Sequence, residues 1–278
     1  MPKIVISPVD PWWKINTDEI LESRDLIWFL LKRDFVSEYK QTFLGNIWFI
    51  LQPLGGTIIF TIIFGNFAKL GTDGMPPLIF YHSGVIIWTF FQGCLNGSAS
   101  ALSKNAGLYQ KVYFPRLISP IVEILNSLWK FLLNFFIFLG FFIYFLLFSD
   151  AHLEPNKMLL LFPLILLTTM MLGTGIGLIL SSFTVKYRDL RFLTPILLQL
   201  WMYFSPIIYS SSLITGKLAM LFWLNPMVSL LEINRYAFTG IGLANVHFLL
   251  YSFSVAAIIF LCGLFFFNRV QQTFVDRI

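Results

Sequence analysis

The apolar run from Phe192 to Ser212 carries aromatic rings, an amide and hydroxyl groups that could contact a polar ligand. Aromatic rings stack on the apolar faces of a ligand, and amides and hydroxyls form hydrogen bonds with its polar groups. Gln199 and Tyr203 are four residues apart, which places them on one face of a helix. We expect four residues to line such a surface: Gln199, Trp201, Tyr203 and Pro206. The alternative is that the aromatic rings only pack, or lie in a belt at a membrane interface.

A compact charged turn precedes this run. Lys186, Arg188, Asp189 and Arg191 lie within six residues, between two long apolar stretches. Four charges near the middle of a hydrocarbon layer would cost on the order of 10 kcal/mol, so the turn must lie outside such a layer. Two readings of its basic residues stay open: they bind an anion, or they only fix the orientation of the chain.

The sequence lacks the motifs of common catalytic, metal and cofactor sites. It contains no G-x-x-x-x-G-K-[ST], so we expect no phosphate-binding loop for a nucleotide. It has no H-E-x-x-H, and His82, His152 and His247 are far apart and near span ends, so we interpret them as interfacial polar residues. Cys94 and Cys262 fall within apolar runs, where cysteine is usually a small buried hydrophobe. We therefore predict no catalytic, cofactor or metal site in this chain.

The composition indicates an all-α integral membrane protein of one domain. Hydrophobic residues make up 57% of 278 positions and charged residues 12%, which is about half the usual charged share. A water-soluble fold of this size cannot hide so much apolar surface. The net charge of +5 does not indicate a nucleic-acid partner, because the location of basic residues matters more in a membrane protein. The first residues, MPKIVISPVDPWWKIN, contain no uninterrupted apolar core, so we expect no cleaved signal peptide.

Six segments within residues 47–278 are long enough to cross a hydrocarbon core of about 30 Å, which needs roughly 20 helical residues. They are Ile47–Phe67, Leu78–Leu102, Ile121–Phe148, Met158–Phe183, Phe192–Ser212 and His247–Phe267. Pro206 lies inside the fifth segment and should kink it. The third carries Glu123 and Lys130 on one helix face, for which we favour a structural role over a functional one.

The distribution of lysine and arginine predicts that both termini lie in the cytoplasm. Residues 1–46, 103–120, 184–191 and 268–278 hold 14 of these residues, whereas the segments on the other side hold four. Residues 213–246 fit this orientation only if they do not span the membrane. Their central apolar run, Leu218–Leu231, is 14 residues long and contains Pro226, which favours short re-entrant helices on the outer side.

Two elements are expected on the cytoplasmic side, after a segment 1–25 that matches no recognisable element. Residues 26–46 predict an amphipathic helix at the membrane interface, because Trp28, Leu31, Phe35 and Tyr39 recur every three or four residues. The alternative is a cytoplasmic helix that packs on a partner. Residues 103–120 form a short aromatic and basic loop that suits docking into a protein groove, or else an ordinary surface loop.

Two stretches carry a resemblance to a known family. They are RDFVSEYKQTFLGNIWFILQPL, from Arg33 to Leu54, and KYRDLRFLTPILLQLWMYFSPIIY, from Lys186 to Tyr209. KVYFPRLISP (Lys111–Pro120) and LNPM (Leu224–Met227) also look like family positions. Together they resemble the transmembrane subunit of ABC-2 type exporters, specifically the permeases for polysaccharide and O-antigen export. The resemblance covers most of the chain beyond residue 25.

The resemblance implies a mechanism. Two copies of the chain would form a channel in the bacterial inner membrane, and two separate ATPase subunits would bind ATP on the cytoplasmic side. ATP would then drive a lipid-linked polysaccharide outward. Teichoic acid and capsule exporters share this architecture and remain alternatives, as do more distant drug exporters. A secondary transporter or a membrane glycosyltransferase is a more remote alternative, because no internal repeat and no cluster of carboxylates or histidines is visible.

The resemblance also implies roles for particular residues. ATPase coupling would involve Arg33 and Tyr39 of the amphipathic helix, and Tyr113, Phe114 and Arg116 of the 103–120 loop. The charged turn would form the cytoplasmic mouth, with Tyr187, Arg188, Asp189 and Arg191. An anionic lipid pyrophosphate could meet Arg188 or Arg191 there. The path of the polymer would be lined by Gln199, Trp201, Tyr203 and Pro206. The outer re-entrant helices would gate the exit through Trp223, Asn225 and Pro226.

Overall fold

The computed structural model describes residues 17–40, 45–109, 111–112, 114–149, 151–184, 186–187 and 189–271. In this part of the chain every regular element is a helix, which confirms the all-α prediction. Five helical segments of the described chain are long and apolar enough to cross a membrane. They are α3 (Trp48–Phe60) continued by the π-helix Thr61–Phe67, α4 (Pro77–Lys104), α6 (Ile118–Phe148), the 3-10 turn Lys157–Leu161 continued by α7 (Phe162–Thr184), and α11 (Val246–Gln271).

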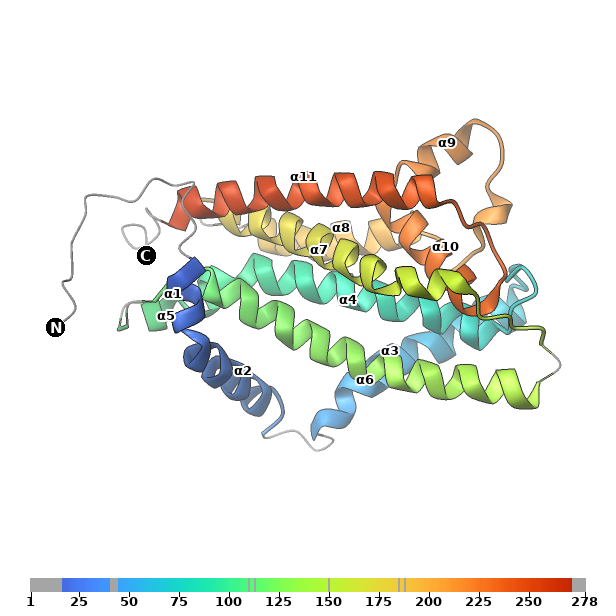
Figure 1. Cartoon of the computed structure of the whole chain (residues 1–278), viewed down its shortest axis with the longest axis horizontal. Helices are drawn as coiled ribbons and strands as arrows, with labels where there is room; N and C mark the ends of the chain where they lie inside the picture. Colours follow the sequence, from blue (N-terminus) through green and yellow to red (C-terminus); the bar gives the residue numbers. More distant parts are fainter. Residues whose placement is uncertain are drawn as a thin grey trace.

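Shorter helices lie beside the long ones or at their ends. They are α1 (Thr17–Glu22), α2 (Arg24–Tyr39), the 3-10 turn Gly45–Ile47, α5 (Ala106–Tyr109), α8 (Leu190–Tyr203), the 3-10 turn Ser211–Leu213, α9 (Lys217–Trp223) and α10 (Pro226–Thr239). Figure 1 shows α1, α5 and the C-terminal end of α11 at one end of the bundle, which we call the α5 end. The opposite end carries α9 and is called the α9 end.

Helix α4 lies at the centre of the bundle. It packs on α6 and α7, and α7 packs in turn on α11 (Figure 1). A Cβ atom added to Gly177 of α7 would lie 2.4 Å from the backbone oxygen of Leu95, and one added to Gly263 would lie 2.4 Å from that of Gly175. Because both distances are too short for a real contact, glycine is required for α4, α7 and α11 to approach so closely.

Helix α8 replaces the fifth predicted span and is shorter than expected. It has 14 residues, or about 21 Å at the helical rise, which is less than the roughly 30 Å of a hydrocarbon core. The helix ends at Tyr203, so Pro206 lies in the following turn and the predicted kink there was wrong; the proline inside α8 is Pro195. Since α7 ends at the α5 end and α11 begins at the α9 end, the chain between them returns along the bundle (Figure 1). The six-span count stays a prediction.

Helices α9 and α10 fall within residues 213–246, where short helices were predicted. Helix α10 has clear boundary signals: the side chain of Asn225 accepts a hydrogen bond from the backbone N–H of Met227, Pro226 is the first helical residue, and Gly240 ends the helix with a φ of 70°. Nearly all of α10 is buried against the bundle. Whether these helices re-enter a membrane stays a prediction.

A buried ion pair anchors α10. Arg235 is 1% exposed and its guanidinium lies 3.1 Å from the carboxylate of Glu232, which is 2% exposed. The guanidinium also lies 3.7 Å from the centre of the Phe80 ring of α4. Burial lowers the pKa of Arg235, and the charge of Glu232 opposes this shift. Arg235 belongs to residues 213–246, which were predicted to lie on the outer side, and it is buried inside the protein.

Candidate functional site

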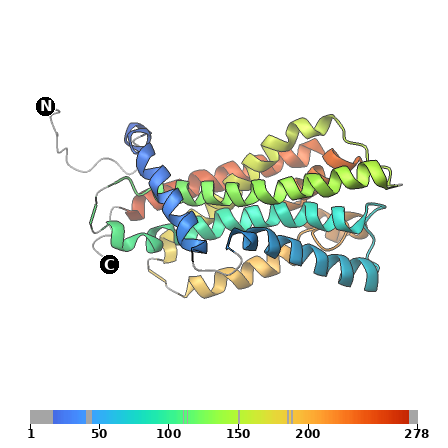
Figure 2. The same cartoon turned by 90° about the horizontal axis from the view of Figure 1, so that it is seen from below.

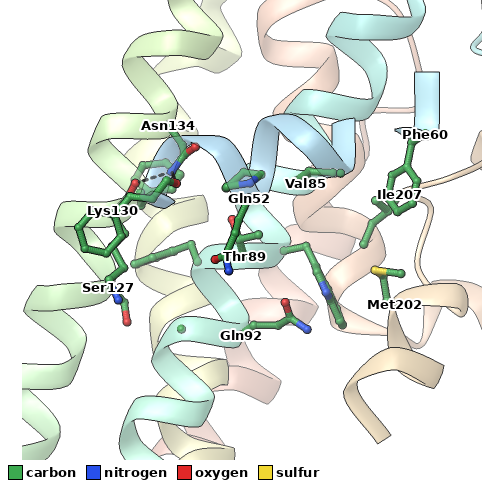
Figure 3. A pocket seen from close by; sticks show the side chains of 17 residues that line it. Gln52, Phe60, Val85, Thr89, Gln92, Ser127, Lys130, Asn134, Met202 and Ile207 are labelled. Carbon is green, nitrogen blue, oxygen red and sulfur yellow. Dashed lines mark hydrogen bonds between the residues drawn. The ribbon is translucent and has the colours of Figure 1, made fainter. Parts of the chain in front are cut away.

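A cavity of about 420 Å³ lies among α3, α4 and α6. Its polar lining comes from Gln52, Thr89, Gln92, Ser127, Lys130 and Asn134. Its aromatic lining comes from Phe49, Phe60, Trp88, Phe90 and Phe131. Met202 of α8 and Ile207 close it on a further side (Figure 3). We call it the α3–α4–α6 cavity. Three of its walls are helices long enough to cross a membrane, so its polar groups are set in an apolar framework.

Hydrogen bonds between α6 and α3 hold the wall of this cavity in place. The side-chain amide of Asn134 donates to the backbone oxygens of Phe49 (3.0 Å) and Lys130 (2.8 Å). The ammonium of Lys130 lies 4.7 Å from the centre of the Phe49 ring, within the range of a cation–π interaction. Figure 3 shows Lys130 and Asn134 on α6 at one side, with Gln52, Thr89 and Gln92 in the middle of the view.

His82 joins α3 to α4 just beyond the cavity. Its Nδ1 lies 2.9 Å from the hydroxyl of Thr57, and its ring contacts those of Phe138 and Phe141 on α6. The side chain is fully buried. The interpretation of His82 as an interfacial residue was therefore wrong: it is a packed polar contact between three helices.

The residues predicted to line the polymer path, three in α8 and Pro206 after it, lie outside the cavity. Gln199 and Tyr203 are exposed and share a face of α8, while Pro206 is buried in the turn that follows. Trp201 points inward: its ring centre lies 5.1 Å from that of Phe91 on α4, and its indole N–H donates to Asn225 at 3.0 Å. The structure therefore does not gather these four residues at one surface, and their role in a polymer path stays a prediction.

The outer-gate residues meet the end of α8. Besides capping α10, Asn225 donates hydrogen bonds to the backbone oxygen of Phe204 and to the hydroxyl of Ser205, both at 3.1 Å. Trp223 stacks on Phe248 of α11, with ring centres 4.8 Å apart. Pro226 follows Asn225 as the first residue of α10. Asn225 is thus the junction between α8 and α10, and gating by these residues stays a prediction.

A charged cluster joins three elements at the α5 end. The ammonium of Lys104, at the end of α4, lies 2.9 Å from Asp34 of α2 and 2.5 Å from Glu123 of α6. Asp34 is 6% exposed. Arg33 contacts Asp34 at 2.7 Å and donates to the side-chain oxygen of Asn105 at 3.0 Å. We call these five residues the Lys104 cluster.

The loop after α4 is packed against α2 and α6. Phe114 is 6% exposed and forms a core with Leu30, Ile118 and Val122. The hydroxyl of Tyr109 shares a hydrogen bond with that of Ser119 at 2.5 Å, and burial raises the pKa of Tyr109 to about 12, which keeps the hydroxyl neutral. This part of the loop is a fixed extension of the bundle.

The structure places the remaining predicted coupling and mouth residues as follows. The guanidinium of Arg116 lies 6.0 Å from the centre of the Tyr109 ring. Tyr187, Asp189 and Arg191 are exposed in the turn before α8 and at its start. Tyr113, Arg188 and the side chain of Tyr39 lie outside the described part of the chain. The coupling and mouth roles stay predictions.

A comparison with known families decides what kind of protein this is. Residues 25–239 match the family model described as ABC-2 type transporter. This match spans more than three quarters of the chain. The chain belongs to the ABC-2 type transporter family. It is therefore a multi-pass membrane protein of a transporter, as its composition and long apolar helices indicated.

Named relatives of this ABC-2 family chain are polysaccharide transport proteins. It is 26% identical to the O-antigen export system permease protein RfbA of Myxococcus xanthus, over 94% of this chain and 98% of that protein. It is 24% identical to RfbA of Klebsiella pneumoniae, over 91% and 94% of the two chains. It is 26% identical to the polysialic acid transport protein KpsM of Escherichia coli, over 75% and 79%.

The cavity of this ABC-2 family chain was not predicted from the sequence. A structural role was expected for Lys130, and no role was expected for Gln52, Thr89 or Gln92. A signal was present, because Lys130 and Asn134 are four residues apart in an otherwise apolar helix and so share a face. The sequence does not indicate which helices pack against that face of α6.

Proposed function

We propose that this chain is the membrane-spanning subunit of an ATP-driven exporter that moves a lipid-linked polysaccharide of the O-antigen type out of the cytoplasm. Two copies would form the channel in the bacterial inner membrane, and two separate ATPase subunits would bind them from the cytoplasmic side. The nucleotide would be bound by the ATPase subunits, so this chain carries no cofactor of its own. The similarity to O-antigen export permeases over more than nine tenths of the chain is the main support.

The α3–α4–α6 cavity supports the substrate class. Its lining combines aromatic rings, which stack on sugars, with amides, a hydroxyl and a cation, which can bind sugar hydroxyls and anions. A purely hydrophobic substrate would not need Gln52, Gln92 and Lys130 among membrane-length helices, where polar groups are costly. The second candidate is a capsular polysaccharide or teichoic acid, and the similarity to KpsM favours the capsular alternative.

The arrangement of the helices supports a cytoplasmic α5 end. Helix α1 and the last turn of α11 both lie there (Figure 1). Lys104, Lys186 and Arg191 also belong to this end, and lysine and arginine are enriched on the cytoplasmic side of membrane proteins. Both termini would then be cytoplasmic, and the ATPase subunits would approach the Lys104 cluster and the 103–120 loop.

Co-expression with the ATPase from the same export system tests the proposal. We expect a purified complex that holds two copies of each subunit, and ATP hydrolysis only when the ATPase is present. Cells that lack the chain should retain lipid-linked polysaccharide in the inner leaflet, and the wild-type gene should restore its export. ATP hydrolysis by the isolated chain, or normal export in its absence, would contradict the proposal.

A further inference from the structure

The lining of the α3–α4–α6 cavity has the chemistry of a ligand site. Its volume of about 420 Å³ falls within the roughly 300–1,000 Å³ typical of small-molecule sites. The side-chain amides of Gln52 and Gln92 make no hydrogen bond within the described part of the chain, and both line the cavity (Figure 3). An amide offers two donors and an acceptor, so this pair can bind several hydroxyl groups.

Lys130 adds a positive charge to the same wall. It stands 12 residues after the start of α6, or about 18 Å along the helix, well inside the apolar length of that helix. An ionisable residue at such depth is costly and commonly marks a substrate pathway. Its ammonium also lies over the ring of Phe49 at 4.7 Å, so packing alone is the competing explanation.

Two further side chains of the lining carry unpaired polar atoms. The indole N–H of Trp88 and the side-chain oxygen of Asn134 have no hydrogen-bond partner among the described residues. Leaving such a group buried and unpaired is unfavourable, because it loses its hydrogen bonds to water. Both atoms are sealed from solvent in this conformation, so only a ligand that draws the side chain into the cavity would pair them.

We propose that the α3–α4–α6 cavity binds one sugar unit that carries a negative charge, with Lys130 against the anionic group and Gln52 and Gln92 against the sugar hydroxyls. This inference rests on the proposed export function and names a subsite for it. The anionic group has two sources: the pyrophosphate that joins the first sugar to the lipid, or an acidic sugar within the polymer.

Binding measurements on the purified permease–ATPase complex test this inference with defined probes. The probes are a short-chain prenyl pyrophosphate sugar, an acidic oligosaccharide, and a neutral alkyl glycoside. We expect Lys130→Met to weaken binding of one anionic probe about tenfold or more, and Lys130→Arg to retain most of the affinity. The neutral glycoside should bind both variants as it binds the wild type. The anionic probe that loses affinity identifies the source of the charge.

A matched control keeps the test interpretable. Lys157 is exposed at the α9 end, so Lys157→Met removes the same charge away from the cavity and should leave all affinities unchanged. Gln92→Leu should weaken every sugar probe, because it removes hydrogen bonds and not charge. Equal binding by wild type, Lys130→Met and Gln92→Leu, with unchanged thermal unfolding, would overturn the inference and leave Lys130 as a packing residue. That result would not affect the export proposal, which depends on ATPase assembly and export.

Discussion

Lys104 lies between two carboxylates that belong to different elements. Asp34 of α2 is 6% exposed and Glu123 of α6 is 12% exposed, and Lys104 compensates the charge of both, while Arg33 also contacts Asp34. Removal of one member of a buried charged group usually costs more than removal of the whole group, because the remaining charges stay buried without compensation. Lys104 is itself 43% exposed, which moderates the effect.

Lys104→Met should therefore destabilise the protein by about 1–2 kcal/mol, because Glu123 would lose its cation and Asp34 would keep only Arg33. A triple variant that adds Asp34→Asn and Glu123→Gln should recover part of this loss. Thermal unfolding of the detergent-purified protein measures both. Lys111→Met, at an exposed position, is the matched control. A triple variant less stable than Lys104→Met would contradict this account of the cluster.

Asn225 offers a second test at the residue scale. Asn225→Ala should lower stability by about 1–3 kcal/mol, because it removes the cap of α10 and the partners of Trp201 and Ser205. Asn225→Asp keeps the acceptor for the cap and for the Trp201 indole but loses the two donated bonds, so it should fall between alanine and wild type. Chemical denaturation in detergent distinguishes the three proteins. Equal stability of the two variants would show that the cap contributes little.

The partners of the charged residues could not be predicted from the sequence. Residues 103–120, which include Lys104, were expected as a loop, yet Lys104 binds Asp34 of α2, 70 residues away in the sequence. Arg235, from the predicted outer segment 213–246, pairs with Glu232 and lies against Phe80. Helical periodicity gives the face of a residue relative to its own axis, but not which other helix covers that face.

Helix α2 is attached to the bundle by a small apolar contact that can be tested separately. Leu30 is 1% exposed and packs with Phe114, Ile118 and Val122. Leu30→Ala should weaken the packing of α2 on the bundle by about 2–4 kcal/mol, because a buried leucine side chain is lost. Helix α2 should then detach from the bundle more often. Hydrogen exchange of residues 24–39 should rise, while α4 and α7 stay protected.

The control for this element is Trp28→Ala, because Trp28 lies on the same helix and is 71% exposed. It should leave hydrogen exchange of α2 unchanged in detergent. If both substitutions raise exchange equally, α2 is held by something other than the Leu30 contact.

At the element scale, the long helices were predictable and α8 was not. Five of the six predicted spans coincide with long helices within a few residues, because about 20 apolar residues have few alternatives to a helix in a membrane. The run from Phe192 to Ser212 has the same composition, but its helix stops at Tyr203. Where the helix ends, Asn225 donates hydrogen bonds to Phe204 and Ser205. Asn225 is some 20 residues away in the sequence, so the residues around Tyr203 do not indicate that the helix ends there.

The whole bundle depends on close contacts between α4, α7 and α11. Gly177→Val should severely destabilise or prevent folding, because its Cβ atom would lie 2.4 Å from the backbone oxygen of Leu95. Gly140→Ala on α6 is the control: no atom lies within 4 Å of the added Cβ, so helix stability should be unchanged or rise by about 0.5–1 kcal/mol. Size-exclusion profiles and thermal unfolding compare the two. A normally folded Gly177→Val protein would contradict this packing.

The orientation of the whole molecule can be tested by labelling from outside intact cells. Lys186 and Thr215 are exposed, the first just after α7 at the α5 end and the second just before α9, so each can be replaced by a single cysteine. A membrane-impermeant thiol reagent should label Thr215→Cys in spheroplasts and Lys186→Cys only after the membrane is opened, in a chain without Cys94 and Cys262. Figure 2 shows that the helices run between these two ends. Labelling of both positions from outside would mean that the chain crosses the membrane differently.

The short length of α8 has a consequence for how the protein is made. A helix of 14 residues is too short to cross the bilayer by itself, and a charged turn precedes it. Its anchor, Asn225, emerges from the ribosome only some 20 residues later. During synthesis α8 would therefore remain beside α7, or within the translocon, until α10 has been synthesised and can pack against it. The second half of the chain would insert as one cooperative unit, whereas α3, α4 and α6 can enter one after another.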